Sequence, residues 1–404
     1  MELLAPAGNM EKLKTALHFG ADAVYVGGKS FSLRAFADNF SNEELIEAVA
    51  YTHALGRKLY VTVNIFPTDA DFVALEEYVR FLDEIGVDAV IMTDNGLIAL
   101  TRKIAPNLAI HVSTQANITN GHTARFYADL GAERVVLARE LSLAQIATIK
   151  SMLPASCEIE CFVHGAMCIS YSGRCLLSSY LTPRDSNRGE CVQACRWSYS
   201  LAESTRGDHP LTIEEDGRGT YILNSRDLNM IEHLADLEKA GVSSLKIEGR
   251  MKTVYYVANV VNAYRRALDW LSAHPGEGLP QEIAGELNKC NNRTYSTGFY
   301  YPRVDANVND ANAQTSGDYD FVAVVLGYAD GVAEIEMRNR FAVGDTLEVL
   351  SAGVGHNRCF RVAEILDNEG NSLAEAKLVQ QKLLLRCEVP LLAGDILRRQ
   401  KPCK

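Results

Sequence analysis

A unit of helix, glycine and short apolar strand recurs between residues 20 and 245 of this chain. The repeats begin at glycine and read Gly20-Ala21-Asp22-Ala23-Val24, Gly86-Val87-Asp88-Ala89-Val90, Gly131-Ala132-Glu133-Arg134-Val135 and Gly241-Val242-Ser243-Ser244-Leu245. Such a glycine suits the left-handed cap that ends a helix, and the apolar run after it suits a strand buried on both faces. Helix starts are marked as well, because Ser41 with Glu44 and Ser142 with Gln145 have capping-box spacing.

The repeat predicts eight strands that alternate with helices. These strands are Leu3–Ala5, Ala23–Val26, Leu59–Asn64, Ala89–Thr93, Ala109–Ser113, Arg134–Ala138, Glu158–His164 and Ser244–Glu248. Eight such units in about 250 residues are typical of an α/β fold of the TIM-type (β/α)8 barrel class. We assign a ninth candidate, Tyr221–Asn224, to an excursion after the seventh strand. An open doubly wound sheet is the alternative, but no G-x-G-x-x-G motif follows an early strand to support it.

The 404-residue length favours more than one domain. We expect the barrel to occupy residues 1–275, with a cysteine-rich excursion at residues 165–220. A helical or irregular connector over residues 276–318 should follow. From residue 319 to residue 404 short alternating strands are divided by glycine and aspartate turns, which predicts a small C-terminal β-barrel domain.

The excursion is rich in thiols. Its cysteines Cys168, Cys175, Cys191 and Cys195 have the spacing C-x6-C-x15-C-x3-C. Four soft ligands can hold an iron–sulfur cluster or a zinc ion. The spacing is irregular for a zinc ribbon, so we favour iron–sulfur over zinc and over unliganded thiols. Cys161 alternates with apolar neighbours in the seventh strand and is expected in the core.

Polar residues follow the predicted strands, at the end of the barrel where this fold carries its chemistry. They include Asn64, Gln115, Asn117, Arg139, Glu140, His164, Glu248 and Arg250. The excursion begins directly after His164, so its cysteines should face the barrel mouth. His164 is a candidate proton carrier, ligand or plain hydrogen-bonding residue. The arginines beside glutamates are candidate anion clamps or internal ion pairs.

Composition restricts the setting. A net charge of -11 argues against a surface coated for nucleic acid, although the excursion is locally basic, with arginines near Tyr171 and Trp197. No segment supplies the roughly 20 apolar residues of a membrane-spanning helix, and the N-terminus lacks signal-peptide features. We therefore expect a cytoplasmic protein, in which clustered thiols favour metal binding over disulfides. No H-E-x-x-H, G-x-S-x-G or P-loop motif is present.

Several segments resemble the collagenase-like peptidase family over essentially the whole chain. They are MELLAPAG, GADAVYVGG, FVHGAMCISYSGRCLLSSY, RDSNRGECVQACRW, NSRDL and SLKIEGR. The resemblance implies a protein required for prephenate-dependent, oxygen-independent hydroxylation of the tRNA wobble uridine, which forms 5-hydroxyuridine. It further implies an iron–sulfur cluster. Because four thiols are clustered, we expect the 4Fe-4S type, acting as a Lewis acid or one-electron relay at the barrel mouth. Relatives that act on ribosomal RNA or ubiquinone precursors share the theme of hydroxylation.

The resemblance also assigns residues. The implied metal ligands are Cys168, Cys175, Cys191 and Cys195. We expect the catalytic residues to be His164, Tyr171 and Glu248. Substrate binding is assigned to Asn64, Gln115, Asn117, Arg139, Arg174, Arg196, Trp197 and Arg250. We expect Arg174, Arg139 or Arg250 to hold a dicarboxylate such as prephenate, and Tyr171 or Trp197 to stack on a uracil flipped out of the tRNA anticodon loop.

Two other function classes stay open. A collagenase-like peptidase would degrade unstructured protein with neither cluster nor RNA. A non-catalytic subunit or scaffold of a hydroxylase complex, active only with a paralogous partner subunit, would bind tRNA without turnover alone. No membrane partner is expected.

Overall fold

The computed structural model describes residues 1–33, 38–168, 170–197, 225–302 and 317–401, together with the backbone of two short strands, β8 (Glu215–Asp216) and β9 (Gly219–Thr220). The chain divides into two compact units. The first contains Met1–Leu13, Asp22–Met251 and Arg293–Thr315, and the second contains Lys14–Ala21, Lys252–Asn292 and Ser316–Lys404. Each unit is therefore assembled from separate stretches of the sequence.

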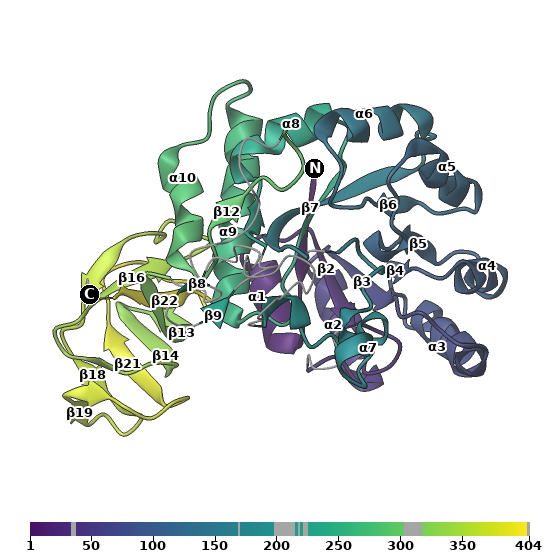
Figure 1. Ribbon diagram of the computed structural model, residues 1–404. Coiled ribbons are helices and arrows are strands. Elements are labelled where there is room, and N and C mark those ends of the chain that lie inside the picture. The colour runs from purple at the N-terminus through teal and green to yellow at the C-terminus, as the bar shows by residue number, and fades with distance from the viewer. Residues whose placement is uncertain are drawn as a thin grey trace, which may run out of the picture. The chain divides into compact units, whose positions relative to one another are not determined.

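The first unit is a closed barrel of eight parallel strands (Figure 1). Its strands are β1 (Glu2–Pro6), β2 (Ala23–Gly27), β3 (Lys58–Val63), β4 (Ala89–Met92), β5 (Ala109–Val112), β6 (Arg134–Val136), β7 (Glu158–Ala166) and β11 (Ser244–Ile247). The ring closes because β11 pairs in parallel with β1 on one side and with β7 on the other. The predicted TIM-type barrel is confirmed, and each of the eight predicted strands overlaps an observed one. The ninth candidate, Tyr221–Asn224, lies outside the described residues.

Helices alternate with the strands. They are α1 (Met10–His18), α2 (Asn42–Ala54), α3 (Phe72–Glu84), α4 (Asn95–Ile104), α5 (Gly121–Asp129), α6 (Leu143–Met152) and α8 (Leu234–Lys239), and α3 to α6 lie outside the strands (Figure 1). Both predicted capping boxes are present, since Ser41 caps α2 and Ser142 caps α6. The four repeat glycines have φ of 98°, 78°, 89° and 87°, the left-handed conformation that the sequence pattern predicts.

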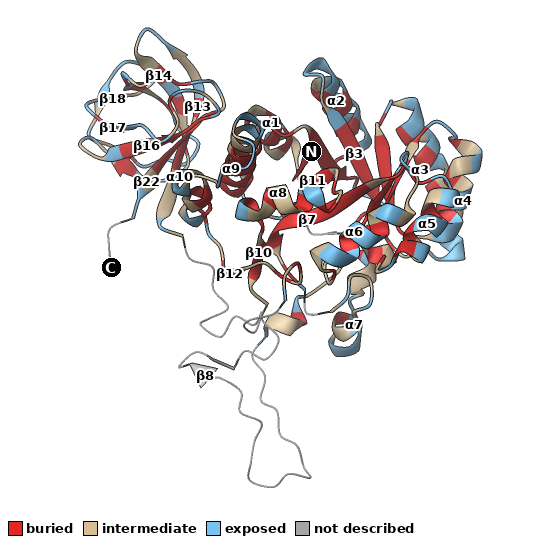
Figure 2. Ribbon diagram, turned by 90° about the horizontal axis from the view of Figure 1, so that it is seen from above, coloured by how far each residue is buried: buried red, intermediate tan, exposed pale blue. Residues whose placement is uncertain are grey.

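The cysteine-rich excursion follows β7, as predicted. Its described part contains α7 (Leu177–Leu181) and two short 3-10 helices, η3 (Ser186–Arg188) and η4 (Ala194–Arg196). The chain then forms β10 (Asp227–Asn229), which pairs antiparallel with the end of β7 and parallel with β12 (Tyr295–Ser296) (Figure 2). Residues that come after the last barrel strand in sequence thus extend the sheet beside the end of β7.

Ionised side chains are buried where the barrel strands begin. Glu160 is fully buried and accepts hydrogen bonds from Lys246 Nζ at 2.7 Å, Arg134 at 3.1 Å and Ser244 Oγ at 3.2 Å. Arg134 also pairs with Glu2 at 2.6 Å. Burial alone would raise the pKa of Glu160, but Lys246 and Arg134 outweigh it and lower that pKa. At the strand starts the buried charges therefore pair with one another. This network occupies the end of the barrel opposite to the carboxyl ends of the strands, where this fold carries its active sites.

The second unit contains α9 (Val254–Ala273), α10 (Gln281–Gly285), η6 (Glu286–Lys289) and an antiparallel sheet in the strand order β17-β16-β22-β13-β14-β21-β18-β19. The strands are β13 (Tyr319–Ala329), β14 (Val332–Met337), β16 (Thr346–Leu350), β17 (Cys359–Arg361), β18 (Ile365–Leu366), β19 (Ser372–Leu373), β21 (Lys382–Arg386) and β22 (Ile396–Gln400). The expected β-barrel is an open sheet curled as a half-barrel, because edge strands β17 and β19 do not pair with each other within the described residues.

None of the helices in the described ranges is both long enough and apolar enough to cross a membrane.

A buried arginine joins the elements of the second unit. The Arg398 side chain is fully buried and pairs with Glu286 at 2.5 Å and Glu348 at 2.6 Å. Its guanidinium also donates to Asn259 Oδ1 at 2.8 Å and Asn357 Oδ1 at 2.7 Å. Because a buried charge without partners is costly, these contacts fix α9 and η6 against β16 and β22.

We expect Glu286→Gln to destabilise the second unit by about 3 kcal/mol at pH 7. Although burial raises the pKa of Glu286, Arg398 outweighs it and lowers that pKa from 4.5 to about 2. Since the folded pKa is depressed, this contribution is present above pH 4.5 and is lost as the pH falls toward about 2. Urea unfolding can be followed by Trp270 of α9, the only tryptophan left in a Trp197→Phe background.

The matched control is Glu76→Gln, because Glu76 is an exposed carboxylate that pairs with Arg80 at the surface. This variant should show no measurable change in stability at either pH. A Glu286→Gln deficit that is as large at pH 2 as at pH 7 would contradict the assignment.

Candidate functional site

The excursion lies against the carboxyl ends of the barrel strands. At Gly173, where φ is 72°, a Cβ atom would lie 2.6 Å from the Gln115 carbonyl oxygen and 3.2 Å from the Phe66 ring. Phe66 in turn donates its N–H to the Asn187 carbonyl at 3.3 Å. Arg188 binds the Phe66 carbonyl at 3.0 Å and Asp71 at 3.1 Å. The loops after β3 and β5 therefore support the excursion, as the sequence analysis expected.

The four clustered thiols gather around Cys195. Cys168 is exposed, and Cys175, Cys191 and Cys195 are half-buried. Burial raises the pKa of Cys195, and the sulfurs of Cys168, Cys191 and Cys175 act in the same direction because they lie nearby. The Cys191 sulfur accepts hydrogen bonds from the Gln193 N–H at 3.4 Å and from Ser178 Oγ at 3.8 Å. Hydrogen bonds to sulfur are one way in which proteins tune thiolate ligands.

The donor set suits a soft metal centre. Four thiols on one excursion are the ligand type of an iron–sulfur cluster or a structural zinc. Within the described ranges, however, no group of three or more His, Cys, Asp or Glu side chains is spaced to hold a metal ion. The four thiols are therefore of the right type and lie near one another, but in the described residues they are not placed at metal-binding distances. Cys161 is buried in β7, and burial raises the pKa of its thiol to about 12, as befits a core residue.

A pair of guanidinium groups lies beside Cys195. Arg293 is buried and pairs with Asp227 at 3.1 Å, and its backbone N–H donates to the same carboxylate at 3.2 Å. Burial lowers the pKa of Arg293 and the nearby Arg196 lowers it further, whereas Asp227 and Cys195 oppose that shift. Arg196 was expected here from the sequence, but Arg293 and Asp227 were not. No local signal marks them, because the pairing of β10 with β12 brings them in.

A second group of side chains meets where β6, β7 and β11 end. His164 is buried, its ring centre lies 5.4 Å from that of Tyr295, and its carbonyl accepts the Glu248 N–H at 2.9 Å. Arg139 donates to the Ala166 carbonyl at 2.8 Å, stands 3.9 Å above the Phe162 ring and lies 3.6 Å from the Glu248 carboxylate. The structure thus brings Arg139, His164 and Glu248 together.

Two residues assigned to substrate binding contact each other. Asn64 Nδ2 donates to Gln115 Oε1 at 2.8 Å, and Asn64 Oδ1 accepts the Leu33 N–H at 3.3 Å. Asn117 ends the short helix η2 (Thr114–Ala116) in a left-handed conformation with φ of 56°. The Asn64–Gln115 pair therefore links the loop after β2 to the loop that supports the excursion.

Arg250 binds the loop after β2. Its buried guanidinium donates to Ser32 Oγ and to Thr62 Oγ1, both at 2.7 Å, and also to the Leu33 carbonyl. A Cβ atom at Gly27 would collide with this guanidinium. These are the contacts of a residue that positions a loop, and the substrate-binding role expected for Arg250 stays a prediction.

The remaining predicted residues are on the outside of the excursion. The Tyr171 and Trp197 side chains are 49% and 42% exposed, and Arg174 is exposed as well. The Arg174 backbone N–H donates to the Tyr171 carbonyl at 3.0 Å. Exposed aromatic and guanidinium groups of this kind can contact a large ligand at the mouth, but the structure does not place them beside His164.

Several known proteins are similar to this chain over most of its length. The tRNA hydroxylation protein P1 of Bacillus subtilis (strain 168) is 40% identical over 99% of this chain and 95% of its own length. The 23S rRNA 5-hydroxycytidine C2501 synthase of Escherichia coli (strain K12) is 35% identical over 87% of this chain and 52% of its own length. The Collagenase of Porphyromonas gingivalis (strain ATCC BAA-308 / W83) is 30% identical over 88% of this chain and 87% of its own length.

Two family descriptions together span most of the chain. Residues 8–310 match Peptidase family U32, and residues 317–398 match the Peptidase family U32 C-terminal domain. These matches agree with the resemblance carried by the cysteine segment and the strand motifs. The chain therefore belongs to peptidase family U32, the collagenase-like family.

Proposed function

We propose that this protein hydroxylates RNA, and that its substrate is the wobble uridine of tRNA, which becomes 5-hydroxyuridine. The observation that carries the proposal is the set of four thiols gathered at the carboxyl ends of the barrel strands, beside Arg196 and Arg293. Relatives named as a tRNA hydroxylation protein and as a 23S rRNA 5-hydroxycytidine synthase support RNA as the substrate class. A tRNA substrate suits a cytoplasmic protein.

In this proposal Cys168, Cys175, Cys191 and Cys195 hold a 4Fe-4S cluster, which when bound supplies Lewis-acid or one-electron chemistry. The chain's own residues would hold the reactants. Arg196 and Arg293 place two guanidinium groups beside Cys195. Guanidinium groups bind carboxylates, which suits an anionic co-substrate. We propose that this co-substrate is prephenate and that the reaction is oxygen-independent. Tyr171 and Trp197, both exposed, would stack on unpaired bases of the anticodon loop.

His164 and Glu248 are the proposed proton-handling groups. His164 is buried at the end of β7, where its ring faces Tyr295, so water has little access to it. Arg139 lies 3.6 Å from the Glu248 carboxylate and can exchange that weak pairing for a carboxylate of the co-substrate. Glu140 is a further candidate acid, because burial raises its pKa.

A peptidase is the second candidate, favoured by the relative named Collagenase. Such an activity should persist in metal-free protein acting on unstructured protein. If the protein instead serves as a non-catalytic subunit, it should bind tRNA but turn over only with a paralogous partner. Assays of the purified chain with and without metal separate these functions.

We expect anaerobically purified protein to be brown and to contain about four iron and four sulfide per chain. Alanine at Cys168, Cys175, Cys191 or Cys195 should each abolish the visible absorption, because each removes one ligand. The matched control is Cys359→Ala, since Cys359 is an exposed cysteine in the second unit. Iron and sulfide assays check the content, and stoichiometric zinc without iron would contradict the cluster.

Cells that lack this protein should lose 5-hydroxyuridine-derived nucleosides from tRNA once any oxygen-dependent route is also removed. Wild type should restore them, whereas Arg196→Gln should restore at most about a tenth, the loss expected for one contact of 1.4 kcal/mol. Arg80→Gln on α3 is the control, since Arg80 is an exposed guanidinium that pairs with Glu76 at the surface. Mass spectrometry of tRNA nucleosides gives the measurement, and nucleosides unchanged in the null strain would rule out the proposed reaction.

A further inference from the structure

The helix α7 exposes two large apolar side chains next to each other. Leu176 and Tyr180 are 69% and 88% exposed. The Tyr180 N–H donates to the Leu176 carbonyl at 2.9 Å, so the two side chains lie one helical turn apart on the same side of α7. We call this pair the α7 face. Large apolar side chains that are exposed together are typical of a surface that contacts another molecule.

The opposite side of the same helix contacts the thiol cluster. Ser178 is buried, and its hydroxyl donates to the Cys191 sulfur at 3.8 Å and accepts the Val192 N–H at 3.2 Å. Residues two positions apart in an α-helix point about 200° away from each other. Because Ser178 points toward Cys191, Tyr180 points away from it. The α7 face is therefore fixed to the thiol-bearing segment and directed outward from it.

An arginine follows the α7 face at the end of the helix. Thr182 Oγ1 donates to the Ser178 carbonyl at 2.8 Å and accepts the Arg184 N–H at 3.2 Å. These two hydrogen bonds fix the backbone of Arg184 at the carboxyl end of α7, and the residue is exposed. A guanidinium group in such a position can bind a phosphate.

The exposed charges of the excursion are positive. Residues 170–197 contain four arginines and two acids. Both carboxylates bind the backbone of the excursion itself, since Asp185 accepts the Asn187 N–H at 2.8 Å and Glu190 accepts the Asp185 N–H at 3.4 Å. Neither acid is exposed, whereas three of the four arginines are. This surface is thus complementary to a phosphate backbone, on a chain whose net charge is -11.

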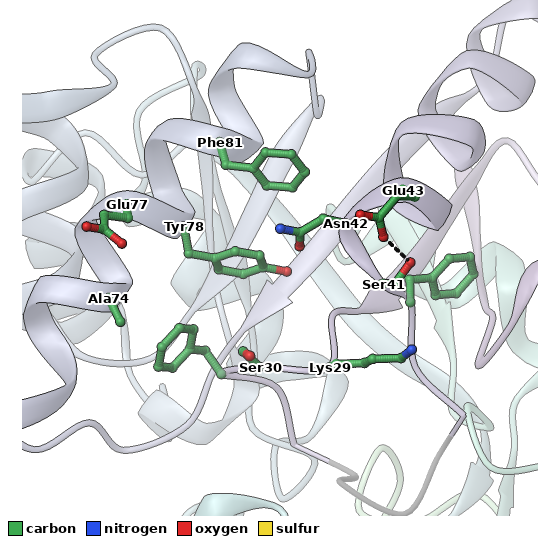
Figure 3. Close-up of a pocket in the computed structure, with 11 residues that line it drawn as sticks. Lys29, Ser30, Ser41, Asn42, Glu43, Ala74, Glu77, Tyr78 and Phe81 are labelled. Carbon is green, nitrogen blue, oxygen red and sulfur yellow. Dashed lines mark hydrogen bonds between the residues drawn. The ribbon is translucent and has the colours of Figure 1, made fainter.

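A cavity of about 500 Å³ beside the loop after β2 has the opposite charge (Figure 3). Its lining includes two carboxylates, Glu43 and Glu77, and one cation, Lys29. Figure 3 shows Glu43 beside Ser41, whose hydroxyl donates to it at 2.8 Å. Because carboxylates repel phosphates, charge favours the excursion over this cavity as the place that binds RNA.

We propose that the α7 face and Arg184 form a docking surface for the unpaired loop of the RNA substrate. One base stacks on the Tyr180 ring, and Arg184 binds a phosphate of the same strand. Aromatic rings next to guanidinium groups recognise single strands in this way. Since Tyr180 points away from Cys191, the stacked base is a neighbour of the base that reacts. The inference rests on the proposed RNA hydroxylation and adds a contact outside the thiol site.

The experiment measures binding of a fluorescent anticodon stem-loop RNA to the whole, anaerobically purified protein by fluorescence anisotropy. Tyr180→Ala should weaken binding about 5- to 150-fold, the range for one stacked base. Tyr180→Phe keeps the ring and should bind as wild type. Phe126→Ala is the matched control, because Phe126 is a 50% exposed aromatic residue on α5, and it should also bind as wild type.

The salt dependence of binding tests the role of Arg184. Arg184→Gln should reduce the slope of log affinity against log salt by about 0.7, the value for one phosphate contact with a single strand. Tyr180→Ala should leave this slope unchanged although it lowers the affinity. Because both side chains are exposed, neither substitution should change the melting temperature, and this separates loss of binding from loss of folding.

An RNA affinity that Tyr180→Ala does not change would overturn the inference. A wild type that self-associates in light scattering through Tyr180, with RNA affinity independent of this residue, would likewise overturn it and assign the α7 face to a protein interface. If Tyr180→Ala loses RNA binding but the null strain keeps its 5-hydroxyuridine, the docking surface is upheld and the proposed reaction is wrong. If the null strain loses the nucleoside and Tyr180→Ala restores it with unchanged affinity, the reaction is upheld and the docking surface is wrong.

Discussion

The pairing of β11 with both β1 and β7 is the constraint on which the barrel unit depends. It joins the start of the chain to its eighth strand and so turns an open sheet into a ring. At the strand starts this pairing places Lys246 against Glu160 and lets Arg134 reach Glu2. At the strand ends it places Glu248 beside His164 and Arg250 beside Ser32. One set of backbone hydrogen bonds therefore organises both a stabilising ion network and a site.

The two ends of the barrel differ in how their polar and charged side chains are paired. At the starts of the strands the buried charges satisfy one another, so they stabilise the folded state and offer nothing to a ligand. At the carboxyl ends four thiols cluster, and the guanidinium groups of Arg196 and Arg293 lie near Cys195. Thiols and guanidinium groups arranged in this way gain from a bound metal or anion, as expected where stability is exchanged for function.

Local signals predicted the fold well because caps, glycines and apolar runs act on neighbouring residues. The capping boxes at Ser41 and Ser142 and the eight strands were read from such signals and are confirmed. Contacts between distant residues could not be read in this way. The contact of Arg250 with Ser32 joins positions 218 residues apart, and Arg293 reaches Asp227 only through β12. The thiol cluster was visible in the sequence as spacing, but spacing does not choose a metal.

The return of residues 293–302 to the barrel has a consequence for how the protein is made. A chain that emerges from the ribosome has all eight barrel strands once Ile247 is out, but Arg293 and Tyr295 follow only after the whole of α9 and α10. Until then Cys195 has no Arg293 beside it and His164 has no Tyr295 against its ring. The surroundings of Cys195 and His164 are therefore completed only after all eight barrel strands have been made, by a segment that is synthesised about 45 residues later.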